Sequence, residues 1–173
     1  MKNITKVLAT ATAVIAFSNS SFAQATATAA ASATVITPIS IVKNIDMSFG
    51  NLAVSSSLAG TLALSPSSTR VVGGAGGVTL PSNTGTVAAA DFTVSGQASF
   101  TYAITLPTGT VTINSGSNTM SVGTFISSPS TTGTLSSGGT QDLTIGATLT
   151  ATAGQAAGNY TNSTAVPVTV NYN

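Results

Sequence analysis

The clearest pattern of hydrophobic and polar positions lies between residues 141 and 173. Along residues 141–150, apolar side chains recur at every second position, as in a strand with one buried face. These positions are Leu143, Ile145, Ala147 and Leu149. After a glycine-containing bend, the alternation returns along residues 160–172. The positions that share one face there are Tyr160, Thr164, Val166, Val168, Val170 and Tyr172. The pattern predicts a half-buried antiparallel hairpin.

Another pair of alternating segments occupies residues 91–96 and 100–107, with a short connection between them. Such spacing is typical of two neighbouring strands. This pair is expected to supply the bulky part of the core. The core residues predicted from it are Phe92, Val94, Phe100 and Tyr102.

Shorter segments of the same kind recur along the rest of the chain. Strands are predicted at residues 35–43 (interrupted by Pro38), 60–65, 110–113 and 120–126. A short strand or tight loop with a buried Phe49 is predicted at 46–52. A hairpin with a glycine turn is predicted at 69–80, and a loop at 127–140. Many short strands with turn residues between them, and no amphipathic helix, are typical of an all-β domain. Two antiparallel sheets can then close a core as a β-sandwich.

Residues 1–23 have the features of a secretory signal peptide. Lys2 and Lys6 form the basic start, residues 7–17 form an apolar stretch, and residues 21–23 form a small-residue cleavage site. A membrane-spanning helix is the alternative, but it needs roughly 20 apolar residues. The apolar stretch holds only 11 residues. We therefore expect an exported protein located in the periplasm, on the outer cell surface or outside the cell, with no integral membrane span after processing.

Processing would leave a mature chain that begins at Gln24 and opens with an Ala- and Thr-rich stretch, residues 24–34. Alanine favours helices, and chain ends often fray, so a helix and a flexible terminus remain alternatives. The continuation into a Thr-Val-Ile run favours an extended N-terminal arm that can pair as an intermolecular strand. The residues on one face of that strand are Ala25, Ala27, Ala29, Ala31, Ala33 and Val35. Residues 35–173 are expected to form a single β-sandwich domain.

Charge is scarce in the mature chain. Removal of Lys2 and Lys6 leaves two cations, Lys43 and Arg70, against three aspartates, so the net charge is −1. Two separated cations cannot form the basic surface that nucleic acids require. Near-neutrality also means that charge repulsion does not oppose self-association.

The residue types that carry most enzyme chemistry are missing. The chain contains neither His nor Cys, which removes the commonest general base and metal ligand and any disulfide. Asp91 and Asp142 precede predicted strands and are expected to cap turns. Lys43 has no serine–lysine motif around it and is expected to be an exposed strand-end charge. The glycines at 73–77 lack the helix and lysine of a phosphate-binding loop. We therefore expect a non-enzymatic protein with no cofactor and no metal.

Short segments distributed along the mature chain carry a family resemblance. They are residues 33–39 (ATVITPI), 49–50 (FG), 92–96 (FTVSG), 102–107 (YAITLP), 145–149 (IGATL), 155–160 (QAAGNY) and 168–173 (VTVNYN). Together they resemble a family of small exported bacterial domains of unknown function, number 4402 in the domain-of-unknown-function series.

A looser resemblance rests on Gly158, Tyr160 and the alternating Val and Thr residues after them. This pattern is similar to spore-coat-U-type and other chaperone–usher pilins. The resemblance implies an immunoglobulin-like sandwich that is completed by a neighbour's N-terminal strand at an open sheet edge. The chain departs from many pilins because it lacks cysteines and because its arm carries Ala where a donor strand carries larger hydrophobic residues.

Two functions follow as hypotheses. The first is a pilin-like or surface-coat structural subunit that assembles by strand addition, with filament neighbours and a periplasmic chaperone as partners. The alternative is a self-contained surface or periplasmic binding or adhesion module, for example for glycans, that uses the Gly- and Ser-rich loops. Loops 115–119 and 127–140 contain no aromatic residue to stack on a sugar ring, which favours the first hypothesis.

Overall fold

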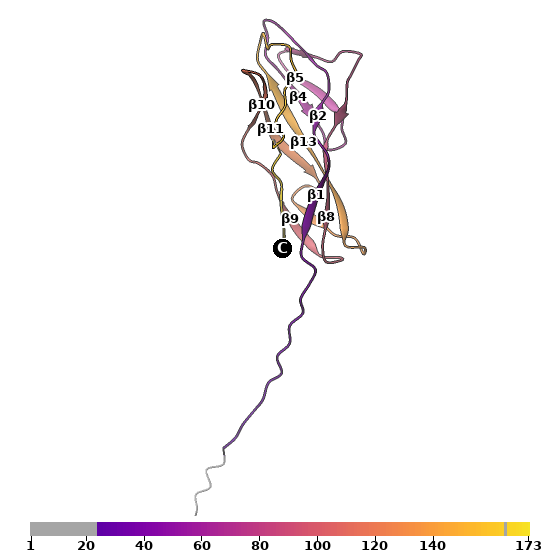
Figure 1. Ribbon diagram of the computed structural model, residues 1–173, viewed down its shortest axis with the longest axis vertical. Coiled ribbons are helices and arrows are strands. Elements are labelled where there is room, and N and C mark those ends of the chain that lie inside the picture. The colour runs from indigo at the N-terminus through magenta and orange to yellow at the C-terminus, as the bar shows by residue number, and fades with distance from the viewer. Residues whose placement is uncertain (1–23, 165) are drawn as a thin grey trace, which may run out of the picture. The chain divides into compact units, whose positions relative to one another are not determined.

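The computed structural model describes residues 24–164 and 166–173, which contain strands and no helix (Figure 1). The predicted signal peptide, residues 1–23, lies outside the described residues. The strands are β1 Ser40–Ile45, β2 Ser48–Phe49, β3 Ala53–Val54, β4 Gly60–Leu64, β5 Arg70–Gly74, β6 Val78–Thr79, β7 Val87–Ala88, β8 Ala90–Ser95, β9 Thr101–Thr105, β10 Val111–Ser115, β11 Asn118–Ser128, β12 Thr132–Thr134, β13 Thr140–Ala151 and β14 Thr169–Tyr172. The all-β, antiparallel character of the predicted fold is confirmed.

Strand β13 is the central strand of the largest sheet. The sheet runs β1-β8-β13-β11-β10, and β4 and β5 extend it beside the C-terminal half of β13. One edge of β13 pairs with β11, and the other pairs first with β8, through residues 140–145, and then with β4, through residues 147–151. The change of partner falls at Gly146, where a Cβ atom would lie 2.1 Å from the Leu64 carbonyl oxygen. Both edges of β13 are therefore occupied.

A smaller sheet, β12-β9-β14, packs over part of the large one. The buried side chains between the two sheets form what we call the covered core: Ala90, Phe92, Val94, Tyr102, Ile104, Leu135, Leu143, Ile145 and Val170. A second buried cluster, the open core, lies farther along the large sheet: Leu62, Val78, Met120, Val122, Ala147, Leu149 and Ala151. The small sheet contributes no residue to the open core, so the second layer of the sandwich covers only part of the first.

The predicted C-terminal hairpin is wrong. Its first strand is β13, with the predicted face buried, but β14 is short and pairs with β9. Since both edges of β13 are taken, the C-terminal segment has no place beside it and crosses to the other sheet. Its predicted face is nevertheless correct, because Val170 is buried and Tyr172 is half-buried.

The predicted pairing of residues 91–96 with residues 100–107 is also wrong. Strand β8 pairs with β1 and β13, whereas β9 pairs with β12 and β14. The two strands belong to different sheets and both supply the covered core. Of the four core residues predicted from this pair, Phe100 is the exception, since 43% of its surface is exposed. Its ring packs edge-on against Tyr172, with the ring centroids 5.9 Å apart.

Among the shorter segments, the strands predicted at 60–65, 110–113 and 120–126 are confirmed as β4, β10 and β11. The hairpin predicted at 69–80 is wrong, because β5 pairs with β4 and β6 pairs with β3. The predicted loop at 127–140 contains β12 and the buried Leu135. Phe49 is half-buried, and the first strand of the sheet begins at Ser40, not at residue 35.

The crowding at Gly146 predicts that a larger residue at this position lowers the stability of the fold. Gly146→Ala would press a methyl group against the backbone of β4, which can only relax by shifting the strand. Overpacking of this kind costs about 1–3 kcal/mol. We expect a lower thermal midpoint, measured by circular dichroism, than for Gly109→Ala, which places its methyl group in open space. Equal midpoints for the two variants would contradict the packing described at the change of partner.

The burial of Tyr102 predicts that the stability of the fold depends on pH in the alkaline range. Its hydroxyl donates to Gln141 Oε1 at 2.8 Å, and burial raises the pKa of the phenol. Above about pH 10, the ordinary tyrosine pKa, the unfolded chain loses a proton that the folded chain keeps. The free energy of unfolding therefore falls as the pH rises from about 10 through the raised native pKa, and the contribution is fully present at lower pH. We expect thermal midpoints to fall less steeply above about pH 10 in Tyr102→Phe than in the wild type; parallel declines would refute this.

Candidate functional site

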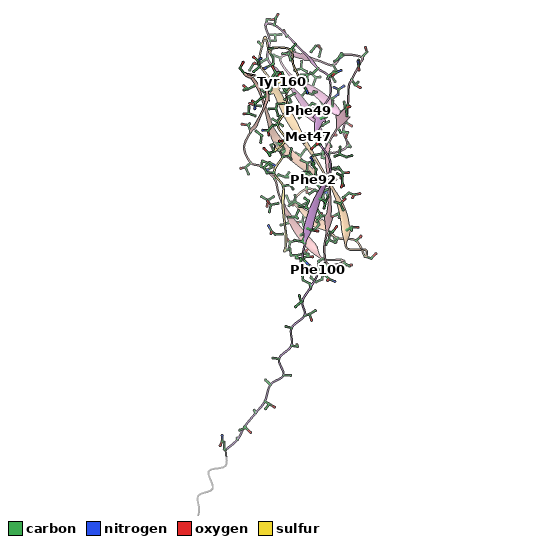
Figure 2. All side chains as sticks on the ribbon, viewed as in Figure 1. Met47, Phe49, Phe92, Phe100 and Tyr160 are labelled. Atoms are coloured by element: carbon green, nitrogen blue, oxygen red, sulfur yellow. The ribbon has the colours of Figure 1, made fainter. Side chains whose placement is uncertain are left out.

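A groove of about 1480 Å³ opens beside the open core. Residues 45–54 form one wall, and residues 155–164 together with Val166 form the other. Its floor comes from buried side chains of the large sheet: Ala90, Phe92, Met120, Val122 and Leu149. Figure 2 shows Met47, Phe49 and Tyr160 toward one end of the sandwich and Phe100 at the opposite end. The groove therefore lies where the small sheet is missing.

The first wall is held by short ladders and one arginine. Strand β2 pairs with β7 and β3 pairs with β6, through two residue pairs each. Arg70 Nη1 donates to the carbonyl oxygens of Phe49 and Asn51, at 3.0 and 2.9 Å. The guanidinium group is always charged and presents several donors in a fixed plane, which suits it to tie two carbonyl groups together. In the sequence, Arg70 is recognisable only as an isolated charge, because its partners Phe49 and Asn51 lie 21 and 19 residues away.

The second wall is held by side chains and a single β-bridge between Asn114 and Thr161. Gln155 Nε2 donates to Tyr160 Oη at 2.8 Å and to the Thr119 carbonyl oxygen at 3.0 Å. Asn162 Nδ2 donates to the Thr112 carbonyl oxygen at 2.7 Å. These bonds fix the wall without a regular ladder.

Two strand edges in or next to the groove are unpaired within the described chain: β1 lines the groove, whereas β14 begins beyond Val166, the last lining residue. Strand β1 pairs only with β8, and β14 pairs only with β9. Between the bridge at Thr161 and the start of β14 at Thr169, the described residues form no strand. Lys43 and Ile45 from the end of β1 and Val166 from the segment before β14 line the groove. An unpaired edge presents backbone N–H and C=O groups that can pair with another strand.

Apolar side chains from the short ladders β2-β7 and β3-β6, from loops and from β10 cover the open core in place of a continuous second sheet. Met47, Phe49, Leu52, Val54, Ile113 and Tyr160 pack on it and are each half-buried. In a complete sandwich a second sheet occupies this position, about 10 Å above the first. Side chains from loops and two-residue strands can be displaced more easily than a paired strand. The site is therefore suited to receive an extended segment of chain.

The predicted arm is described separately from the sandwich. The chain divides into two compact units, residues 1–34 and Val35–Asn173. The described part of the first unit, residues 24–34, is exposed and forms no strand. Insertion of Ala25, Ala27, Ala29, Ala31 and Ala33 into a groove thus stays a prediction. Val35, the sixth residue of the predicted face, is 96% exposed, an unusual state for a large apolar side chain.

The titratable residues singled out in the sequence, Lys43, Asp91 and Asp142, lie in strands of the large sheet. Asp91 and Asp142 lie inside β8 and β13, so the predicted turn-capping role is wrong. Lys43 is an exposed residue of the edge strand β1 and forms an ion pair with Asp46. Across residues 24–164 and 166–173, no three His, Cys, Asp or Glu residues cluster as a metal site would require. No helix long and apolar enough to cross a membrane occurs in these residues.

The fold and the groove define an all-β sandwich domain with an incomplete second layer. The family model described as "Domain of unknown function (DUF4402)" matches residues 39–172, and the chain belongs to this family. The matched region contains both walls and the floor of the groove. No curated protein and no solved structure matches the chain.

Proposed function

We propose that the protein is an exported structural subunit that assembles by strand addition, as pilin-like or surface-coat proteins do. In this proposal, residues 24–36 of one copy enter the groove of a second copy. The observation that carries it is the groove itself, which lies beside the unpaired edges of β1 and, beyond Val166, of β14, and which is covered by short ladders and loop side chains in place of a continuous sheet. An added strand would pair with these edges through its backbone and place alternate side chains over the open core.

The lengths of the two segments support pairing over their whole extent. The arm of residues 24–36 and the C-terminal segment of residues 160–172 each contain 13 residues. Both would span about 40 Å as strands, at roughly 3.3 Å per residue. The arm therefore has enough residues to pair along this segment.

The chemistry of the arm is compatible with this position. Residues 24–42 carry no charged side chain, so entry over the apolar floor of the groove desolvates no charged side chain of the arm. The alanines on one face would lie toward the floor, and Thr26 and Thr28 on the other face would lie toward solvent. Burial of apolar surface contributes ~25 cal/mol per Å². An alanine side chain buries little such surface, so each one contributes little to the affinity. Much of the affinity would therefore come from backbone pairing, which favours a reversible assembly.

Export and partners are part of the same proposal. The basic start, apolar stretch and small-residue cleavage site at the N-terminus support secretion, after which the arm becomes the start of the chain. An empty groove and free strand edges promote non-specific pairing. A periplasmic chaperone that covers the groove until a second copy arrives would prevent this.

Alternation along the arm gives a direct test in the mature full-length protein. Ala29→Asp places a carboxylate toward the floor of the groove, where its desolvation opposes insertion. Thr28→Asp adds the same charge on the solvent-facing side and serves as the matched control. We expect Ala29→Asp to raise the concentration needed for multimers at least about tenfold, equivalent to ~1.4 kcal/mol, and Thr28→Asp to change it little. Analytical ultracentrifugation measures both. Equal effects, or a wild-type chain that stays monomeric at high concentration, would argue against strand addition.

A further inference from the structure

A side-chain clamp holds the point where the chain enters the sandwich. The Tyr172 hydroxyl accepts a hydrogen bond from the Gln97 backbone N–H at 2.6 Å and donates one to the Thr37 carbonyl oxygen at 2.7 Å. The Thr37 N–H donates to Gln97 Oε1 at 3.2 Å. Both backbone polar groups of Thr37 are therefore engaged, although it lies outside any strand. We call Thr37, Gln97 and Tyr172 the Tyr172 clamp.

The surroundings of the clamp fix the tyrosine in place. Phe100 packs edge-on against the Tyr172 ring, at an interplanar angle of 72°. A Cβ atom at Gly96 would lie 2.3 Å from the Tyr172 hydroxyl oxygen, so any larger residue there would displace the hydroxyl. The aromatic contact and the space left by glycine together orient the hydroxyl toward Thr37 and Gln97.

The sequence on either side of Thr37 resists reversal of the chain. Residues 34–37 are Thr-Val-Ile-Thr, a run of β-branched residues that favours an extended backbone. Tight turns instead use Gly, Asn, Asp, Pro or Ser at their central positions. Pro38 follows, and the residue before a proline is also driven to extended conformations. The chain therefore passes through the clamp as an extended segment.

The clamp and the groove lie toward opposite ends of the sandwich. Figure 2 places Phe100, which packs on the clamp, at one end and Tyr160 of the groove wall toward the other. After the clamp, β1 runs along the sandwich toward Lys43 and Ile45 at the groove. To enter its own groove, the segment before Thr37 would have to reverse direction beside β1. The clamp and the β-branched run both oppose that reversal.

We propose that the Tyr172 clamp determines which groove the arm enters, by fixing Thr37 so that the extended run before it directs the arm to a second copy and not to its own chain. The inference rests on the proposed function. Its consequence is a head-to-tail contact that uses different surfaces on the two partners. Such a contact repeats without closing unless the rotation happens to form a ring, so it generates a filament.

The test separates insertion within one chain from insertion between chains. The chain has no cysteine, so Thr28→Cys in the arm and Ser163→Cys in the groove wall provide a unique pair for a bis-maleimide cross-linker. A mixture of isotopically labelled and unlabelled mature protein is cross-linked, and mass spectrometry of the 28–163 peptide pair counts mixed-label products, which arise only between chains. The same pair is then measured with Tyr172→Phe, which keeps the ring and removes the hydroxyl.

With Tyr172 and an equimolar mixture, we expect mixed-label products to approach half of all 28–163 products, the statistical limit when every insertion is between chains. With Tyr172→Phe, the ratio of interchain to intrachain products should fall at least about fivefold, as expected when hydrogen bonds of ordinary strength are lost. Tyr102→Phe is the matched control, since it removes a hydroxyl bond to Gln141 in the covered core and leaves the clamp intact. Its ratio should stay at the wild-type value.

Each other outcome overturns a specific claim. If interchain products dominate equally with and without the Tyr172 hydroxyl, the clamp does not select the partner, and strand addition between copies still stands. If Tyr102→Phe lowers the ratio as much as Tyr172→Phe, general loss of stability is the cause and the clamp is refuted. If no 28–163 product forms in any variant, the arm does not enter the groove, and the proposed function fails together with the inference.

Discussion

The hydrogen bonding of β13 is the constraint on which the rest of the structure depends. This strand pairs along one edge with β11 and along the other with β8 and then β4, so no further strand can be added to it. Its inward side chains run continuously through both cores, from Leu143 to Ala151. The C-terminal segment therefore has to pack over this face from another sheet. It does so through β14 for only four residues, which leaves only the two-residue ladders β2-β7 and β3-β6 and loop side chains over the open core.

The groove follows from that incomplete layer. A sandwich buries the apolar faces of two sheets against each other, but here the open core is covered by side chains that Arg70, Gln155 and Tyr160 hold through hydrogen bonds to backbone and to one another. The unpaired edges of β1 and β14 add backbone donors and acceptors. An extended, uncharged segment satisfies both needs at once, and the N-terminal arm of this protein has that composition.

Alternation along the sequence predicted which residues are buried far better than which strands pair. The inward face was correct for β8, β9, β13 and β14, because alternation reports the face that a strand buries. It contains no information about the neighbour across the ladder, and this is why both predicted hairpins with strong alternation were wrong. Phe100 was misplaced because the alternating pattern extends beyond the start of β9, next to a partly exposed turn. The groove walls were not predictable, since Arg70 and Gln155 act through long-range contacts that leave no local pattern.

The central claim is that the open core of one copy is completed by a strand from another, and amide hydrogen exchange of assembled protein against monomer tests it most directly. Backbone N–H groups in a newly paired ladder gain protection. The account predicts that residues 24–36 and residues 162–168 become protected together on assembly, while the outer strand β5 exchanges as before. Multimers in which both segments exchange as fast as in the monomer would contradict it.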